Sequence, residues 1–459
     1  MYRLRDVSRL RRCVVLFIVL FLYPLQLLSL DSESHFSSIS VPKNAGLYIF
    51  DVESGAEIFS RNATVPLKPA SVLKILTAYT MLQVHDPYKR IPTEVLSRGA
   101  SGSHIQTLYI RGNGDPQLTQ ENVWFIARKV RQRGVRSIGR IVVDDTRFID
   151  APSQTGQRAY QAGASALSFN FNSIGVEVCP SANGIRVAHE PREVPVQFSG
   201  KISQRSKKGG VFNVDRVSNA GYPLHFKLGG QMFRGSACEE VYRSVPDPAL
   251  YLGYALSGYL EKEGIDIQSP VSKEKTPSGT KVFYTHYSKP LREAVGALNT
   301  FSNNMIAEQL VILAGKQSRD SYSHSAGLSR LADELVNVGA SREDFALFDG
   351  SGLSHSNRIT SKHLGMILQK ALTHPEHKVE FEASLPVDSK SGTLKKRSYL
   401  GVVRAKTGTL TGVTSLAGAL ESKNGRKIGF VLLQNKVSSH AKASTLEKKV
   451  ISRIYNYTL

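Results

Sequence analysis

A serine and a lysine three residues apart in the stretch PASVLKILTAYTML (residues 69–82) could form a catalytic pair. Ser71 follows Pro69 and Ala70, which are typical of a helix start, so its hydroxyl would lie near the positive end of the helix dipole. Lys74 would share that face one turn later, among apolar neighbours that lower the pKa of its amine, as a lysine base requires. The alternative is an N-cap serine followed by a lysine whose stem covers apolar surface.

The spacing alone does not decide between these alternatives. Ser-x-x-Lys occurs five times in the chain, also beginning at Ser40, Ser272, Ser278 and Ser439. Context has to select one of them.

Two further motifs supply that context. The first is Ser302-Asn303-Asn304, a Ser-x-Asn on a predicted turn before a helix, and the second is Lys406-Thr407-Gly408-Thr409, at the end of an extended, β-branched run. Each is weak alone, because Ser-x-Asn also begins at Ser60, Ser168, Ser181 and Ser422, and a rival Lys-Ser-Gly begins at Lys390. Lys390 lies in a loop-like segment, so Lys406 is the better candidate for a strand edge. In this order the three motifs match the signature of serine β-lactamases and penicillin-binding proteins.

From about residue 45 to 440 the chain resembles the low-molecular-mass class C penicillin-binding proteins, which are exported serine D-alanyl-D-alanine carboxypeptidases and endopeptidases. The matching segments are PASVLK (69–74), RGNGDPQL (111–118), DDTRFID (144–150), SALSFNFN (165–172), SNNMIAE (302–308), DGSGLSHSNRIT (349–360), LP (385–386) with GTLKKR (392–397), and VRAKTGTLTGV (403–413). The first and last are the most specific. GNGDP and DGSG are rich in turn formers, so we assign them no catalytic role.

The resemblance implies a role for each catalytic position. Ser71 would attack the carbonyl between two D-alanines, and Lys74 would take its proton. Ser302 would relay a proton to the leaving amine, assisted by Lys406, and Asn304 would hold the peptide backbone. Which lysine or serine is the true base is disputed in such sites.

The resemblance also implies a substrate-binding strand. The backbone N–H groups of Ser71 and Thr409 would hold the oxyanion. The Thr407 and Thr409 hydroxyls, together with Gly408 and the Lys406 charge, would bind the terminal carboxylate of the substrate. Peptidoglycan peptides are the expected substrates, and β-lactams are the expected covalent inhibitors.

The implied fold is of the α/β (α+β) class: an antiparallel sheet flanked by helices, interrupted by a large β-rich insert of one or two lobes. The expected organisation is a leader at 1–32, the first part of the catalytic domain at 38–95, the insert at 96–289 and the second part of the catalytic domain at 290–459.

Periodicity predicts the elements that would position the motifs. Residues 46–62 should form two strands joined by a turn, and a helix should start at about Ser71. Helical patterning returns after 290, and the chain ends in strands joined by an Asn-Gly turn and a helix near 440–456. That last helix is basic and amphipathic, which suits packing on the sheet or contact with a membrane surface.

The first 30 residues predict export. Five arginines precede the apolar run CVVLFIVLFLYPLQLLSL, as in a signal peptide, although the run is long and lacks a clear cleavage site. An uncleaved N-terminal anchor therefore remains an alternative to a cleaved signal peptide. In either case the expected location is periplasmic or extracellular, in the cell envelope. The formal charge of +21 falls to about +17 without this segment. A basic exported protein suits an anionic envelope, or uses its charge for solubility.

The remaining chemistry-bearing residues predict neither a metal nor a cofactor. No Cys/His cluster has zinc spacing, and no zinc, helix-turn-helix or RNA-binding signature indicates nucleic acid. Cys179 and Cys238 would either pair or stay as two buried thiols, and the sequence does not show which. The oligomeric state is not predicted.

Two other functions stay as alternatives. A serine β-lactamase-like hydrolase shares the three motifs, but the class A form needs a glutamate in a Glu-x-x-Leu-Asn context that is missing here, and the long insert also argues against it. A catalytically silent peptidoglycan-binding protein is disfavoured because every catalytic position holds the required residue type.

Overall fold

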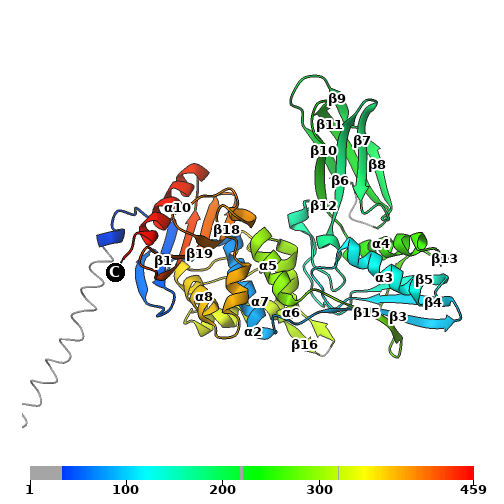
Figure 1. The fold of residues 1–459 in the computed structure, drawn as a ribbon, viewed down its shortest axis with the longest axis horizontal. Helices are drawn as coiled ribbons and strands as arrows, with labels where there is room; N and C mark the ends of the chain where they lie inside the picture. The colour runs from blue at the N-terminus through cyan, green and yellow to red at the C-terminus, as the bar shows by residue number, and fades with distance from the viewer. Residues whose placement is uncertain (1–33, 218–220, 319, 459) are drawn as a thin grey trace, which may run out of the picture. The chain divides into compact units, whose positions relative to one another are not determined.

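The computed structural model describes residues 34–217, 221–318 and 320–458 (Figure 1). These residues fall into two compact units. Residues 34–72, Leu335–Ala346 and residues 355–458 form the first, and the described part of Leu73–Glu334 with Leu347–Ser354 forms the second. The predicted leader lies outside the described residues. Within them, no helix is both long enough and apolar enough to cross a membrane.

A five-stranded antiparallel sheet forms the centre of the first unit. Its strands, in order across the sheet, are β18 (Val403–Leu410), β19 (Val413–Glu421), β20 (Lys427–Asn435), β1 (Ala45–Asp51) and β2 (Glu57–Arg61). β1 and β2 are the strand pair predicted from residues 46–62, and the turn at Ser422–Gly425 joins β19 to β20 as the Asn-Gly signal predicts. The first and last parts of the chain thus share one sheet.

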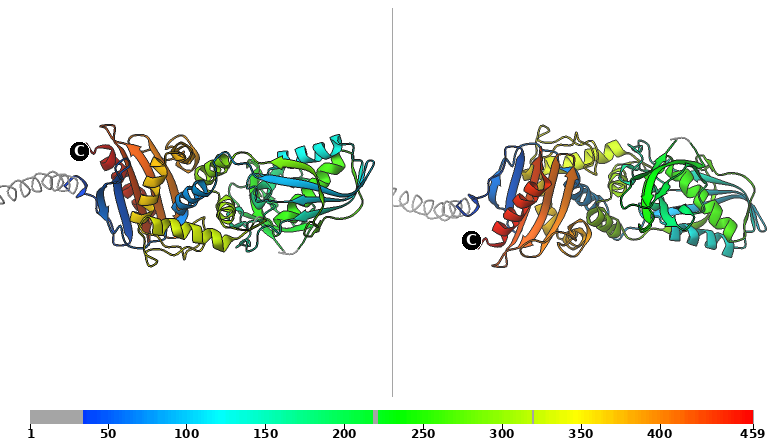
Figure 2. Two further views of the ribbon diagram at one scale, coloured as in Figure 1. Left: turned by 90° about the horizontal axis from the view of Figure 1, so that it is seen from below. Right: turned by 90° about the horizontal axis from the view of Figure 1, so that it is seen from above.

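Helices cover both faces of this sheet because successive side chains of each strand point to opposite sides. On one face, Leu47 and Ile49 of β1 are buried with Val450 and Ile451 of α10 (His440–Tyr455). On the other face, α8 (Ser361–Thr373) packs against the intervening Tyr48 and Phe50 of β1, where Gly365 leaves room for the Tyr48 ring. Figure 2 shows α10 lying across the strands in this unit. The shorter α9 (Lys378–Ser384) and the 3-10 turn η4 (Gly392–Leu394) precede β18.

The second unit contains the long segment between the first two motifs. Its larger sheet has the order β13-β5-β4-β3-β15, with β14 also paired to β5. The strands are β3 (Pro92–Ser101), β4 (His104–Arg111), β5 (Ser137–Asp144), β13 (Asp266–Ile267), β14 (Ser272–Lys273) and β15 (Lys281–Tyr287). β3 therefore begins before residue 96.

Two helices that the sequence analysis did not predict accompany this sheet, α3 (Gln120–Gln132) and α4 (Pro248–Lys262). The α3 sequence buries Val123, Ile126, Ala127 and Val130, a spacing of three and four residues that fits a helix. The expectation of a β-rich segment overlooked this pattern because the flanking runs are short strands.

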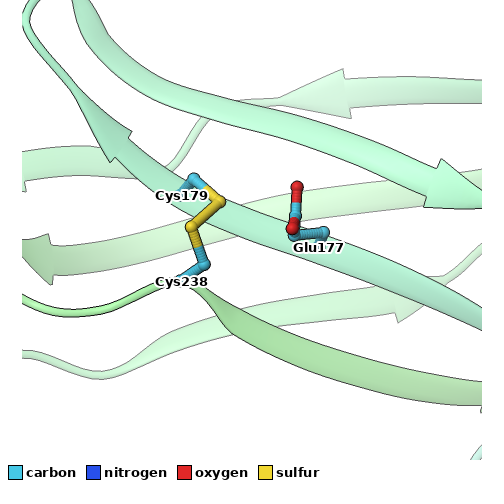
Figure 3. Close-up of side chains that lie close together, drawn as sticks. All are labelled: Glu177, Cys179 and Cys238. Atoms are coloured by element: carbon cyan, nitrogen blue, oxygen red, sulfur yellow. A yellow bond between two sulfur atoms is a disulfide. The ribbon is translucent and has the colours of Figure 1, made fainter.

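Two smaller sheets complete the segment. One has the order β12-β6-β7, and in the other β11 pairs with β10, β8 and β9. The strands are β6 (Ser173–Ser181), β7 (Gly184–Glu190), β8 (Val196–Gly200), β9 (Ser203–Arg205), β10 (Phe212–Arg216), β11 (Leu224–Phe233) and β12 (Glu239–Ser244). A disulfide joins Cys179 of β6 to Cys238, just before the neighbouring β12 (Figure 3). Of the two alternatives left by the sequence, the structure shows the paired one. Glu177 lies beside this pair, but sulfur atoms joined in a disulfide are not thiolate ligands for a metal.

The remaining helices of the second unit carry two of the motifs. α2 (Lys74–Val84) contacts both α5 (Leu291–Phe301) and α6 (Asn304–Ala314), the helices predicted after residue 290. The short pair β16 (Lys316–Ser318) and β17 (Ser321–Tyr322) follows α6. α7 (His324–Asn337) begins in this unit and ends in the first.

Candidate active site

Ser71 lies in the 3-10 turn η1 (Ala70–Leu73), which leads directly into α2. The residue before it, buried Ala70, has φ +50°, in the left-handed region that a residue with a Cβ rarely adopts. Such a conformation costs roughly 1–2 kcal/mol and persists only where the surrounding structure imposes it. The backbone therefore places Ser71 in a defined position, and its side chain is partly exposed.

The strand β18 passes next to Ser71 within the first unit. A Cβ on Gly408 would lie 3.0 Å from the backbone nitrogen of Ser71 and 3.0 Å from the carbonyl oxygen of Pro69. Glycine is therefore the residue that allows this close approach. The structure thus brings Ser71 and the Lys-Thr-Gly motif together.

The side chains of that motif differ in their exposure. Lys406 is fully buried and its Nζ donates to the carbonyl of Thr407 (2.8 Å), whereas Thr409 is exposed. The Thr407 hydroxyl donates to that of Thr393 (2.8 Å). Lys406 lies within β18 rather than at its end, because Thr407–Leu410 continue the pairing with β19 as far as the turn. β18 is the edge strand of the sheet, so one side of the motif has no neighbouring strand in it.

Lys74 is completely buried in the second unit. Its Nζ donates to Oδ1 of Asn304 (2.7 Å) and to the carbonyl of Ser351 (2.5 Å). Burial lowers the pKa of Lys74 to about 7, although the nearby carboxylates of Glu308 and Asp349 act in the opposite direction. Two of the predicted catalytic residues are therefore in direct contact, and the amine can lose its proton near neutral pH.

The Ser-x-Asn motif forms the tight connection between α5 and α6. Ser302 is the C-cap of α5 and, like Ala70, has a left-handed backbone, with φ +58°. The Asn303 side chain caps α6 by accepting from the backbone N–H of Ile306 (3.0 Å), and Nδ2 of Asn304 donates to the carbonyl of Tyr160 (2.9 Å). The turn leaves Ser302 partly exposed and places the Asn304 amide against Lys74.

Glu308 is a site residue that the sequence analysis missed. It lies one turn after Asn304 on α6, is 7 % exposed, and accepts from the backbone N–H groups of Gly350 (3.2 Å) and Ser351 (2.9 Å). His324 also hydrogen-bonds this carboxylate (2.8 Å). The signal was a single acidic residue in the apolar run MIAEQLVILA, where a buried carboxylate needs partners.

The DGSG segment therefore does more than turn the chain. Glu308 holds the backbone at Gly350 and Ser351, and the Ser351 carbonyl accepts from Lys74. Asp349 fixes the rest of the turn by accepting from the backbone N–H groups of Gly352 (2.7 Å) and Ser354 (2.6 Å). The earlier assignment of a turn is correct, but the turn also positions the lysine.

A cavity of about 490 Å³ opens beside Ser302–Asn304 within the second unit. Its remaining wall comes from the segment between the first two motifs and is aromatic and acidic, formed in part by Tyr160, Phe171, Glu190, Glu240 and Tyr242.

The rival motifs have other roles in the structure. Ser439 is the N-cap of α10 and accepts from the backbone N–H of Lys442, which is the non-catalytic alternative considered for Ser71. Ser272 donates to the side chain of Glu274 (3.1 Å) in an exposed segment. Lys390 is exposed in a turn that follows Ser389, whose φ is +58°.

Comparison with known proteins gives a consistent set of matches. A family model described as "D-Ala-D-Ala carboxypeptidase 3 (S13) family" matches residues 33–456. A D-alanyl-D-alanine carboxypeptidase of Actinomadura sp. is 30 % identical over 85 % of this chain and 77 % of its own length. A D-alanyl-D-alanine carboxypeptidase DacB of Haemophilus influenzae is 24 % identical over 90 % of this chain and 91 % of its own length.

Solved structures show the same fold. Penicillin binding protein 4 from Haemophilus influenzae matches with a TM-score of 0.80 and 22 % identity, over 93 % of this chain and 100 % of that one. A structure of the same protein in complex with a β-lactam matches with a TM-score of 0.76 and 21 % identity, over the same shares. A peptidoglycan endopeptidase from Bdellovibrio bacteriovorus matches with a TM-score of 0.57 and 16 % identity, over 91 % of this chain and 93 % of that one.

Proposed function

The chain belongs to the D-Ala-D-Ala carboxypeptidase 3 (S13) family, and we propose that it cleaves D-alanyl-D-alanine bonds of peptidoglycan stem peptides through an acyl-enzyme on Ser71. It is a serine hydrolase of the low-molecular-mass class C penicillin-binding proteins. The observation that carries the assignment of the site is the buried Lys74 amine, whose pKa is lowered to about 7 and which contacts Asn304 of the second motif.

Acylation follows from the chemistry of these groups. Neutral Lys74 accepts the proton of the Ser71 hydroxyl while the oxygen attacks the carbonyl carbon of the penultimate D-alanine. As the carbon–nitrogen bond breaks, Ser302 gives its hydroxyl proton to the leaving amine and takes in its place the proton held by Lys74, with the positive charge of Lys406 assisting. Asn304 holds the peptide backbone, and terminal D-alanine leaves. Water then attacks the ester and restores the Ser71 hydroxyl.

The developing oxyanion accepts hydrogen bonds from the backbone N–H groups of Ser71 and Thr409. The close approach of Gly408 to Ser71 supports this role, because it brings β18 within backbone distance of the nucleophile. Thr407 and Thr409 bind the terminal carboxylate of the substrate, with Lys406 supplying positive charge. A β-lactam occupies the same place and acylates the same serine.

We place the enzyme in the cell envelope, outside the cytoplasmic membrane. The leader-like sequence of residues 1–30 supports export. The Cys179–Cys238 disulfide supports the same location, because such bonds persist in oxidising compartments.

A direct assay tests the function. The purified enzyme should release D-alanine from a stem pentapeptide that ends in D-alanyl-D-alanine, and prior incubation with a penicillin should block the release. Mass spectrometry of the products, with a crosslinked muropeptide dimer as a second substrate, measures carboxypeptidase and endopeptidase action together. Rapid, repeated hydrolysis of the penicillin without D-alanine release would instead indicate a β-lactamase. Neither product release nor acylation would indicate a silent binding protein.

The pKa of Lys74 predicts a pH profile. Below about pH 7 the amine is protonated and cannot accept the Ser71 proton, so the rate of penicillin acylation should rise with pH and level off above about 7. Removing one nearby carboxylate with Glu308→Gln should move the inflection to lower pH, because that charge holds the pKa of Lys74 up. Stopped-flow acylation between pH 5 and 9 measures both profiles.

The matched control for this profile is Glu343→Gln. Glu343 is exposed, and its replacement also removes one negative charge, but it is not among the carboxylates that raise the pKa of Lys74. Its profile should equal that of the unmodified enzyme. A rate that is flat from pH 5 to 9, or an inflection that Glu308→Gln leaves in place, would contradict the assignment of Lys74 as the base.

A further inference from the structure

The helix α10 presents a basic outer face, defined here as Lys442, Lys448 and Lys449. All three side chains are exposed, whereas the opposite side of the helix, with Val450 and Ile454, is buried against the sheet. No ion pair neutralises these lysines within the described residues. The carboxylate of α10, Glu447, is 1 % exposed and bound by Arg397. The face is therefore purely cationic.

One edge of the α10 basic face adjoins the segment through which the chain arrives from its N-terminal leader. His35 Nε2 hydrogen-bonds the carbonyl of Arg453 (2.8 Å), and the Phe36 ring packs 5.5 Å from that of Tyr457. Lys449 Nζ donates to the carbonyl of Ser38. Residues 35–38, which follow the apolar and arginine-rich residues 1–30 in the sequence, therefore lie beside this face.

The other edge carries exposed apolar side chains. Tyr399 hydrogen-bonds Glu447 of α10 (3.2 Å), and Gly401 packs so closely on the Tyr455 ring that a Cβ would lie 2.6 Å from Cδ2. Leu400, between Tyr399 and Gly401, is 47 % exposed, and Val402, directly after Gly401, is 59 % exposed. We call these two residues the apolar pair. Exposed Lys395 and Lys396 precede it.

A groove of about 470 Å³ runs between the N-terminal half of α10 and residues 40–45. Lys436, Lys442 and Lys449 line it. The groove offers space and positive charge for an anionic phosphate group at the same surface.

We propose that the α10 basic face and the apolar pair form a docking surface for an anionic lipid membrane. Lysines at a surface are attracted to anionic lipid headgroups, and adjacent apolar side chains enter the boundary between headgroups and acyl chains. An anionic wall polymer would use the lysines but would gain nothing from Leu400 and Val402. The leader-like residues 1–30 precede this segment by only a few residues, so a leader held in the membrane would keep this face close to it.

Vesicle flotation tests the proposal. Residues 34–458 contain every element described above and nearly the whole family match, so the enzyme beginning at residue 31 is used, without the leader. It should bind vesicles of phosphatidylcholine with 30 mol % phosphatidylglycerol, and binding should fall steeply with added salt. Lys442→Glu/Lys448→Glu/Lys449→Glu should weaken binding by about tenfold or more. Leu400→Ser/Val402→Ser should weaken it severalfold and leave its salt dependence intact.

The matched control replaces three exposed lysines elsewhere by glutamate, which reverses the charge at Lys281, Lys289 and Lys370. This triple variant has the same net charge as the α10 triple variant, so it should bind nearly as well as the unmodified enzyme. Stoichiometric acylation by a penicillin confirms that each variant is folded, because none of these residues belongs to the proposed catalytic site.

Three outcomes would overturn the proposal. Equal weakening by both triple variants would show that only net charge matters. Equal binding to pure phosphatidylcholine would show that the lysines do not recognise anionic lipid. Binding to purified peptidoglycan with anionic polymer, but not to vesicles, would identify the wall as the partner.

Discussion

Ser71→Ala is expected to abolish both penicillin acylation and D-alanine release. Without the hydroxyl there is no nucleophile, and such losses in serine hydrolases reach roughly four or more orders of magnitude. Intact-protein mass spectrometry after incubation with a penicillin should show the adduct on the unmodified enzyme and none on the variant. Peptide mapping should place the adduct on the peptide that contains Ser71.

The sequence supplies its own controls for this experiment. Ser40→Ala, Ser272→Ala, Ser278→Ala and Ser439→Ala each remove the serine of another Ser-x-x-Lys and should leave labelling intact. If Ser71 were only a helix cap, like Ser439, its replacement would cost about 1 kcal/mol of stability and preserve the chemistry. A penicillin-derived mass on any other peptide would refute the assignment.

The parts of the fold that carry the motifs could be predicted from local sequence. β1 and β20 are short apolar runs bounded by turn residues, and α5 and α6 show clear helical spacing, so periodicity alone indicates them. Their assembly into one sheet from opposite parts of the chain could not be predicted in this way. It came from the resemblance, because local patterns contain no information about which distant strands pair.

The sequence predicted less of the site's geometry than of the fold. Ala70 and Ser302 have left-handed backbone conformations that such residues rarely adopt by themselves. Because the surrounding structure imposes these conformations, the local sequence does not predict them. Glu308 binds the backbone of Gly350 and Ser351, about forty residues further along the chain, and no local pattern indicates such a distant contact. The pairing of Cys179 with Cys238 likewise depended on the register of β6 and β12.

Two of the contacts that hold the buried Lys74 amine come from neutral groups. Lys74 donates to the Asn304 amide oxygen and the Ser351 carbonyl, both of which are neutral. Burial lowers the pKa of Lys74 to about 7, so the amine can serve as a base. The charges of Glu308 and Asp349 limit the fall. Glu308 thus orders the Ser351 acceptor and keeps the pKa of the lysine from falling further.

Lys74→Ala is therefore expected to slow penicillin acylation by about two to four orders of magnitude, the scale of lost general-base assistance. Stopped-flow measurement at pH 8 gives the rate, and the rise with pH near 7 should vanish because the group that titrates is gone. The variant also leaves Asn304 and the Ser351 carbonyl without their donor, so thermal unfolding should be measured alongside.

Lys74→Arg separates proton transfer from positioning. An arginine can still donate to Asn304 and Ser351, but its guanidinium does not lose a proton in a protein. If Lys74 acts as the base, the arginine variant should acylate about as slowly as the alanine variant, even where its unfolding temperature is close to that of the unmodified enzyme. If the lysine only holds Asn304 in place, the arginine variant should recover most of the rate. Recovery of that kind would transfer the role of base to another group, and the two lysine variants together distinguish these mechanisms in a way that either one alone does not.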